Sequence, residues 1–200
     1  SWHLANLDNV DVVKLLSRVI MDLAEGEIKQ NLNRYDSGQT FSKYINKSYC
    51  KTASLIANSC KAAGVLSDIN ADKLDKLYEF GKNIGLAFQV VDDILDFTGN
   101  DKQLGKPAVS DLASGYLTAP VLYALEENKN LSVLIDRELA EKDDLNNALE
   151  IIMSSGAIKK SRILAEDFAT HSKDAILWLP ESEYKRALMA LPEFVLSRLY

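Results

Sequence analysis

The sequence predicts an all-α protein of about eight helices, folded as a single domain over residues 1–200. Three observations support this class. Apolar residues recur at three- and four-residue steps along most of the chain. Strand-type alternation and Asn-Gly hairpin turns are missing, as are internal repeats and low-complexity linkers. With 200 residues, 47% of them hydrophobic, the chain is long enough to bury a substantial core.

The first two predicted helices occupy the N-terminal third. Residues 9–34 form the first, with Asp8 or Asn9 as its N-cap. The second runs from Thr40 to Gly64, where glycine provides a C-terminal stop. The apolar face of the first helix is expected to hold Val12, Leu16, Val19, Leu23 and Ile28.

The third predicted helix is the longest and the most apolar. It starts at Asn70 or Asp72 and ends at Gly99–Asn100. Because it is apolar nearly all round, we expect it in the middle of the bundle. Residues 98–108 contain two Gly, a Pro and Asn-Asp, which indicates a loop.

Helical periodicity resumes after this loop and continues to the end of the chain. Pro120 and Pro192 are expected to mark kinks or breaks in it, because proline cannot donate the backbone hydrogen bond of a helix interior. The predicted helical segments are 110–127, 131–139, 145–153, 158–179 and 181–200.

Composition excludes several functions. The net charge is -6 and no Lys/Arg block stands out, so nucleic acid is not an expected partner. No stretch reaches the ~18 uninterrupted apolar residues that a membrane span requires. Cys50 and Cys60 lack a His at ligand spacing, which excludes a zinc site, and on a helix they lie too far apart for a disulfide. Dinucleotide-binding, Walker-type and nucleophile-elbow motifs are absent from the sequence.

One polar stripe interrupts the apolar third helix. Gln89, Asp92, Asp93 and Asp96 fall within an arc of about 100° on one helix face. Like charges at this spacing repel, and the segment is otherwise built for burial, so positive charge must compensate them. Oxygen ligands on a rigid helix suit Mg²⁺, which completes its coordination shell with waters and phosphates. The alternative is a solvated acidic stripe near the end of a helix.

Two lysines have the chemistry to join this stripe around a phosphate. Lys106 lies in the loop after the acidic helix, where a flexible ammonium could fold back over a metal-bound phosphate. Lys51 and Thr52 lie in mid-helix, either at a helix edge or facing a polar cleft. Glu27 and Gln30, one turn apart, face either the same cleft or solvent.

Several separated motifs go beyond a generic acidic helix. Residues 85–97 read GLAFQVVDDILDF and are followed by LGKP at 104–107 and SDL at 110–112. Upstream stand GEIKQ at 26–30 and KTA at 51–53. Together these elements resemble the second aspartate-rich region and its companion motifs in all-trans isoprenyl diphosphate synthases. The likeness spans the whole chain, and the SWHLANL opening resembles the long-chain solanesyl diphosphate synthases of cyanobacterial and plastid type.

This resemblance implies a fold, a reaction and an assembly. The fold would be an antiparallel helical bundle of the isoprenoid-synthase type, incomplete at its N-terminal side. The reaction would be Mg²⁺-dependent condensation of isopentenyl diphosphate with an allylic diphosphate, farnesyl or geranylgeranyl, to a long-chain all-trans product. The assembly would be a homodimer, or a heteromer with an active partner, and the first predicted helix is long and apolar enough to pair with a copy of itself.

Matching positions also imply roles for individual residues. Asp92 would bind a Mg²⁺ ion directly, with Asp93 and Asp96 acting through metal-bound water. Lys51 and Lys106 would hold the allylic diphosphate. The side-chain oxygens of Thr52 and Gln89 would face the allylic cation and stabilise it without trapping it.

Two departures from the family pattern limit what the resemblance implies. Tyr116 stands where many shorter-chain members carry a second lysine, which removes one cation contact. The first aspartate-rich motif and the isopentenyl diphosphate element are expected before Ser1, so residues 1–200 alone are expected to be inactive. A non-catalytic subunit of a heteromeric prenyltransferase is the main alternative, and a class I terpene cyclase ranks lower because its Asn-Ser-Glu motif is not visible. Cytoplasm and plastid are both compatible locations.

Overall fold

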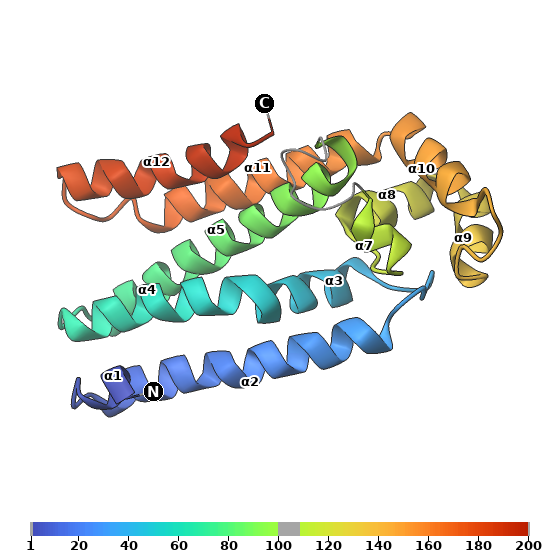
Figure 1. The fold of residues 1–200 in the computed structure, drawn as a ribbon. Helices are drawn as coiled ribbons and strands as arrows, with labels where there is room; N and C mark the ends of the chain where they lie inside the picture. The colour runs from blue at the N-terminus through green and yellow to red at the C-terminus, as the bar shows by residue number, and fades with distance from the viewer. Residues whose placement is uncertain (1, 100–108, 200) are drawn as a thin grey trace.

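The computed structural model describes residues 2–99 and 109–199, which form a bundle of helices with no strand among them (Figure 1). The all-α prediction is therefore confirmed. The segments are α1 (Trp2–Ala5), α2 (Val10–Leu32), α3 (Phe41–Ser48), the π-helix η1 (Tyr49–Ala53), α4 (Ser54–Leu66), α5 (Ala71–Thr98), α7 (Ser110–Ala113), α8 (Ala119–Glu127), α9 (Lys129–Asp136), α10 (Asp144–Ser154), α11 (Ala157–Ala175) and α12 (Glu183–Ser197).

Helix α5 is the centre of the bundle. It lies between α4 on one side and α11 and α12 on the other, as Figure 1 shows in green. Of the two predicted N-caps, Asn70 is the one used, because its side chain accepts from the backbone N–H of Lys73. At the start of α2, Asn9 similarly caps the helix by accepting from Val12. The predicted central position of the third helix is confirmed.

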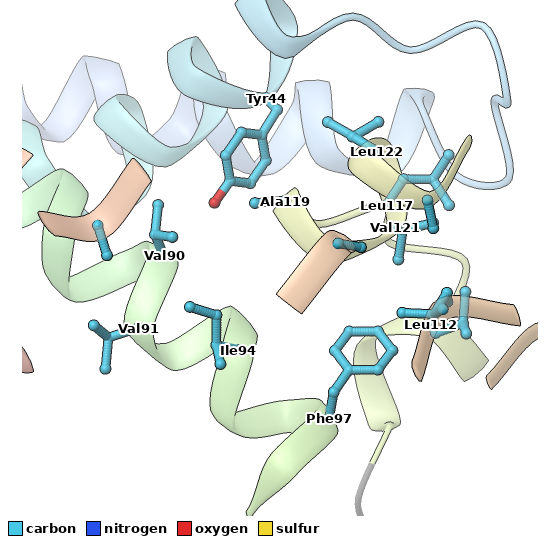
Figure 2. Packing of buried hydrophobic residues seen from close by; sticks show 14 of the residues in the cluster. Tyr44, Val90, Val91, Ile94, Phe97, Leu112, Leu117, Ala119, Val121 and Leu122 are labelled. Carbon is cyan, nitrogen blue, oxygen red and sulfur yellow. The ribbon is translucent and has the colours of Figure 1, made fainter. Parts of the chain in front are cut away.

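A continuous hydrophobic cluster joins α3, α5 and the C-terminal helices. Figure 2 shows Tyr44 pointing from α3 towards Val90 of α5 and Ala119 of α8, with Ile94 and Phe97 further along α5. This cluster anchors the C-terminal half of α5, the half that carries the aspartates. The acidic stripe thus lies on the part of α5 that belongs to the hydrophobic core.

The second predicted helix is not one regular helix. A π-helical turn, η1, replaces α-helical geometry at Tyr49–Ala53 and joins α3 to α4. Two glycines allow its neighbours to approach closely. A Cβ on Gly26 of α2 would lie 2.9 Å from Lys51 Cγ, and a Cβ on Gly85 of α5 would lie 2.6 Å from Ala53 Cα. Turns of this type occur frequently at functional sites, and this one carries Lys51 and Thr52.

The predicted apolar face of α2 is wrong in its C-terminal half. Leu23 and Ile28 are 46% and 62% exposed, whereas Asp22 and Gly26 are buried. The reason is the approach to η1 and α4, because Gly26 makes room for η1 and Asp22 accepts a hydrogen bond of 2.6 Å from Ser54 Oγ. Asp22 also accepts from Arg18 Nε at 2.8 Å. The buried face of α2 therefore changes from apolar to polar along its length.

The two prolines behave differently from each other. Pro120 lies in the first turn of α8, and the predicted 110–127 segment divides into α7 and α8 before it. Pro192 lies inside α12, which continues from Glu183 to Ser197, so a break at this position is wrong and a kink stays a prediction. The predicted loop lies almost wholly outside the described residues. In the described part of the chain, no helix is long and apolar enough to cross a membrane.

Candidate active site

A polar cavity of about 210 Å³ opens beside the C-terminal half of α5, where this helix faces α3, η1 and the turn before α8. Five charged side chains line it. They are Lys47, Lys51, Asp92, Asp93 and Asp111. The sequence placed Asp92 and Asp93 on one helix face and Lys51 on another helix with its orientation open, and the fold brings these three residues to one cavity.

Lys51 faces the cavity rather than bulk solvent, which settles the choice that the sequence left open. Its Nζ donates to Gln30 Oε1 at 2.6 Å and lies 2.9 Å from Glu27 Oε1. Of the two α2 residues, Gln30 lines the cavity, whereas Glu27 is half-exposed and is not part of the lining. These two contacts from α2 hold the ammonium group of Lys51 in place.

A chain of hydrogen bonds fixes Gln89. Thr52 Oγ1 donates to Gln89 Oε1 at 2.6 Å, and Gln89 Nε2 donates to Asp93 Oδ1 at 2.9 Å. Tyr44 Oη donates to Asp93 Oδ2 at 2.7 Å and completes the chain from α3. A carboxylate oxygen can only accept a hydrogen bond, so the group of Gln89 that faces Asp93 is the amide nitrogen. The amide oxygen of Gln89 therefore faces the Thr52 hydroxyl.

Burial governs the chemistry of Asp93. Desolvation raises the pKa of its carboxyl group to about 6. The charge of Lys47 and the hydrogen bonds from Tyr44 and Gln89 oppose this rise, whereas the charge of Asp111 adds to it. Burial likewise raises the pKa of the Tyr44 phenol, with the neighbouring Asp93 charge adding to the effect. Each oxygen of the buried Asp93 carboxylate thus accepts one hydrogen bond from the protein, and the residue lines the cavity.

Asp92 has the more open position. Its side chain is 49% exposed at the cavity, and Oδ1 accepts from Arg198 Nη2 at 2.8 Å. The Arg198 guanidinium also lies 4.7 Å from the centre of the Phe88 ring. Arg198 follows α12 near the end of the chain, and nothing in the spacing of the sequence pointed to this contact with the acidic stripe.

Asp96 does not line the cavity. Its carboxylate is fully buried and accepts from Ser110 Oγ and from the backbone N–H of Asp111, both at 3.1 Å. The backbone carbonyl of Asp96 accepts from Val109 at 2.8 Å. Asp96 therefore fastens the start of α7 to α5, a role that the helical stripe did not predict.

Tyr116 and Lys47 also line the cavity. Tyr116, at the position where the resemblance predicts a lost cation contact, lines the cavity, and Arg34 lies 5.8 Å from the centre of its ring. Lys47 reaches the cavity from α3 and was missed by the sequence analysis. The available signal was its position four residues before Lys51, which places both on one helix face.

The donor set agrees with a Mg²⁺ ion that shares its shell with a ligand. Among residues 2–99 and 109–199, no group of three or more His, Cys, Asp or Glu side chains converges on one point. Mg²⁺ in phosphate-handling sites takes one or two carboxylates plus waters and substrate oxygens, and Asp92 offers such a carboxylate. The other predicted phosphate ligand, Lys106, lies outside the described residues.

Solved structures define the class of this fold. The polyprenyl synthase of Caulobacter crescentus, solved as a complex with calcium and isoprenyl diphosphate, matches with a TM-score of 0.89 at 31% identity over 98% of this chain and 61% of that chain. The fold is that of the isoprenyl diphosphate synthases, as the sequence predicted.

The sequence comparisons then give the family. The polyprenyl synthetase family model matches residues 1–152, and the chain belongs to this family. A prenyl transferase of Synechocystis is 54% identical over 100% of this chain and 62% of its own length. The chloroplastic solanesyl diphosphate synthase 2 of Arabidopsis thaliana is 47% identical over 100% of this chain and 48% of its own length. The chain thus spans about half to three fifths of the length of these relatives.

Proposed function

We propose that the protein containing this chain condenses isopentenyl diphosphate with an allylic diphosphate, farnesyl or geranylgeranyl, and extends it to a long-chain all-trans polyprenyl diphosphate. Family membership and relatives described as prenyl transferases and solanesyl diphosphate synthases support this reaction. The observation that carries the proposal is the cavity that joins Lys51 and Asp92 beside the Thr52–Gln89 pair.

The charged residues of the cavity would bind the diphosphate of the allylic substrate. Lys51, held by Glu27 and Gln30, would contact its oxygens, and Lys106 would contribute from the loop. Asp92 would bind Mg²⁺ directly, and Asp93 and Asp96 would support the ion through metal-bound water. Asp96 would in addition hold the start of α7, because its carboxylate accepts from the backbone N–H of Asp111. A bound Mg²⁺ neutralises charge that develops on a departing diphosphate and so favours ionisation of the C–O bond.

The uncharged residues Thr52 and Gln89 would stabilise the allylic cation. Thr52 Oγ1 donates to Gln89 Oε1 at 2.6 Å, so the two oxygens are held together, and Gln89 is the one of the two residues that lines the cavity. Neither group is a strong nucleophile, because one is a hydroxyl that donates its proton and the other is an amide oxygen. They would stabilise positive charge through their dipoles without forming a covalent adduct.

We further propose a homodimer that uses α2. This helix exposes a second apolar face in addition to the one it packs against the bundle, and isologous pairing of such a face is a common route to dimers. Its exposed apolar residues are Val10, Ile20, Met21, Leu23, Ile28 and Leu32.

We also propose that residues 1–200 form one domain, which the continuous hydrophobic core supports. For the location of the protein we propose the plastid or the cytoplasm, and the chloroplastic relative supports the plastid.

Product analysis tests the proposal. The complete protein is incubated with Mg²⁺, isopentenyl diphosphate and either farnesyl or geranylgeranyl diphosphate, and the products are separated by chain length. We expect prenyl diphosphates longer than the allylic substrate, and we expect residues 1–200 alone to form none. A complete protein that forms no longer product by itself, yet restores elongation to an inactive partner, would replace the proposal with the non-catalytic subunit.

A further inference from the structure

Two buried hydroxyl groups lack a hydrogen-bond partner in the described part of the chain. They are Ser48 Oγ and Thr118 Oγ1, on residues that are 1% and 2% exposed. The Ser48 hydroxyl makes no hydrogen bond of good geometry, although it lies close enough to the Tyr44 phenol to lower the pKa of that group. Buried hydroxyls are nearly always hydrogen-bonded in native proteins, so each exception needs an explanation. Both of these residues line the same polar cavity as Lys51 and Asp92. Their shared location indicates that the missing partner is something that the cavity receives.

Local structure explains why Thr118 has no partner of its own. It occupies the N-cap of α8, where a threonine hydroxyl ordinarily accepts from a backbone N–H in the first turn of the helix. Here the side chain makes no such bond, and Pro120 removes one of the N–H groups that would serve. The Thr118 hydroxyl is therefore left free for the cavity rather than used to cap the helix.

Ser48 is placed in a comparable way at the other wall. It is the last residue of α3 and directly precedes the π-helical turn. Serine in a helix commonly donates to the carbonyl four residues earlier, but Ser48 makes no such bond. The change from α to π geometry thus presents Ser48 and the next cavity lysine, Lys51, on the same side.

Lys47 adds a positive charge to these hydroxyls. Within the described residues its ammonium makes no ion pair within 4.0 Å, and its one close partner is the ring of Tyr44, 5.4 Å from Nζ to the ring centre. Burial lowers the pKa of Lys47, the charges of Asp93 and Asp111 raise it, and that of Lys51 lowers it. A lysine of this length normally extends to solvent or to a carboxylate, whereas this one remains in the cavity wall.

We infer that Lys47, Ser48 and Thr118 form an oxyanion subsite that binds one phosphate group of a diphosphate. The three side chains supply an ammonium and two hydroxyl donors, a set that matches phosphate oxygens. Each oxygen of Asp93 accepts a bond from Tyr44 or Gln89, and the carboxylates of Asp92 and Asp111 also line the cavity, so an anion would bind through these three side chains and not through the carboxylates. An anion with two phosphates spans Lys47 and Lys51, which lie at two points of one cavity.

This inference deepens the proposed function and rests on it for the identity of the ligand. The diphosphate has two sources, the bound allylic substrate and the inorganic pyrophosphate that its ionisation releases. Both present the same oxygens to the subsite, because the bond that breaks joins the diphosphate to carbon. Binding of the two molecules, measured separately, distinguishes the sources.

Isothermal titration calorimetry on the complete protein tests the subsite, with inorganic pyrophosphate and Mg²⁺ as the probe. We expect Lys47→Met and Thr118→Val each to weaken binding about tenfold or more, since hydrogen bonds to charged groups have at least this effect. Matched controls are Lys14→Met, about 24 Å along α2 from Gln30, and Thr170→Val on the exposed face of α11. Thr118→Val is expected to keep or raise the melting temperature, because it removes a buried hydroxyl that has no partner in the chain.

A second titration uses farnesyl diphosphate and Mg²⁺ without isopentenyl diphosphate, so that no elongation occurs. Weakened binding of both probes assigns the subsite to the substrate, and weakened binding of pyrophosphate alone assigns it to the product. If both variants bind both probes as the unsubstituted protein does, the subsite is refuted even where elongation is observed. If the variants bind pyrophosphate less tightly but the protein makes no longer prenyl chain, the subsite stands and the proposed reaction fails.

Discussion

Substitution of Gly85 by alanine tests how the position of η1 determines the site. A Cβ at this position would lie 2.6 Å from Ala53 Cα and 2.8 Å from Ala53 Cβ. Carbon atoms in contact ordinarily stay about 3.5–4.0 Å apart, so α5 and η1 would have to separate by about 1 Å. Both partners are buried helix backbone, which gives way less easily than the end of a flexible side chain.

The size of the effect follows from this separation. Overpacking of a close-packed core costs about 1–3 kcal/mol. For a domain of this length, each kcal/mol lowers the melting temperature by about 2–4 °C. The Thr52–Gln89 hydrogen bond of 2.6 Å joins the same two segments, and a displacement of 1 Å in an active site can reduce activity by about 100-fold.

Differential scanning calorimetry and kcat/KM for elongation measure the two consequences of Gly85→Ala. The matched control is Gly38→Ala, at an exposed turn where a Cβ would meet only Asp36 Oδ1, at 3.2 Å. We expect Gly85→Ala to lower both quantities and Gly38→Ala to change neither. Gly85→Ala protein with the melting temperature and kcat/KM of the unsubstituted protein would refute the argument that close helix approach sets the geometry of the site.

Three further predictions concern ion pairs and a buried hydrogen bond. Arg137 lowers the pKa of the buried Asp144 carboxyl below its ordinary 3.8. The loss of stability caused by Arg137→Met should therefore be complete at neutral pH and shrink as the pH falls below about 4. A stability difference that grows on acidification contradicts this. Arg198→Met frees Asp92 from a half-exposed ion pair and should tighten Mg²⁺-dependent pyrophosphate binding by no more than about fivefold, as titration would show; weaker binding would mean that Arg198 helps to hold the ligand. Ser54→Ala removes the donor to the buried α2 carboxylate and should cost about 1–3 kcal/mol in urea unfolding, a loss that an unchanged midpoint would disprove.

Hydrophobic periodicity was sufficient to predict the fold class and the central helix, because the apolar residues of α5 between Phe80 and Phe97 lie on most sides of the helix. It failed where packing involved polar groups. The same periodicity placed Leu23 and Ile28 inside, since a repeat of apolar residues does not reveal which of two apolar faces meets the bundle. The buried Asp22 could be recognised only through its partners Ser54 and Arg18, one of which lies on another helix.

The candidate site was predicted in part for a related reason. Helical spacing correctly placed Gln89, Asp92 and Asp93 together, but the same spacing cannot show that Asp96 turns to the start of α7. The π-helical turn that carries Lys51 has no sequence signature of its own. Gly26 of α2 and Gly85 of α5 both lie against this turn, and these contacts form only in the folded chain. Arg198 and Thr118 belong to distant segments, and only the folded chain brings Arg198 to Asp92 and Thr118 to the cavity.

The central claim is that the carboxylate of Asp92 binds a divalent ion for prenyl transfer. Its most direct test is the rate of isopentenyl incorporation by the complete protein as Mg²⁺ is varied, for Asp92→Asn beside the exposed control Asp11→Asn. We predict that Asp92→Asn lowers kcat by about 100-fold or more and shifts half-saturation to higher Mg²⁺, while Asp11→Asn follows the unsubstituted curve. An Asp92→Asn protein whose rate and Mg²⁺ dependence match those of the control would contradict the account.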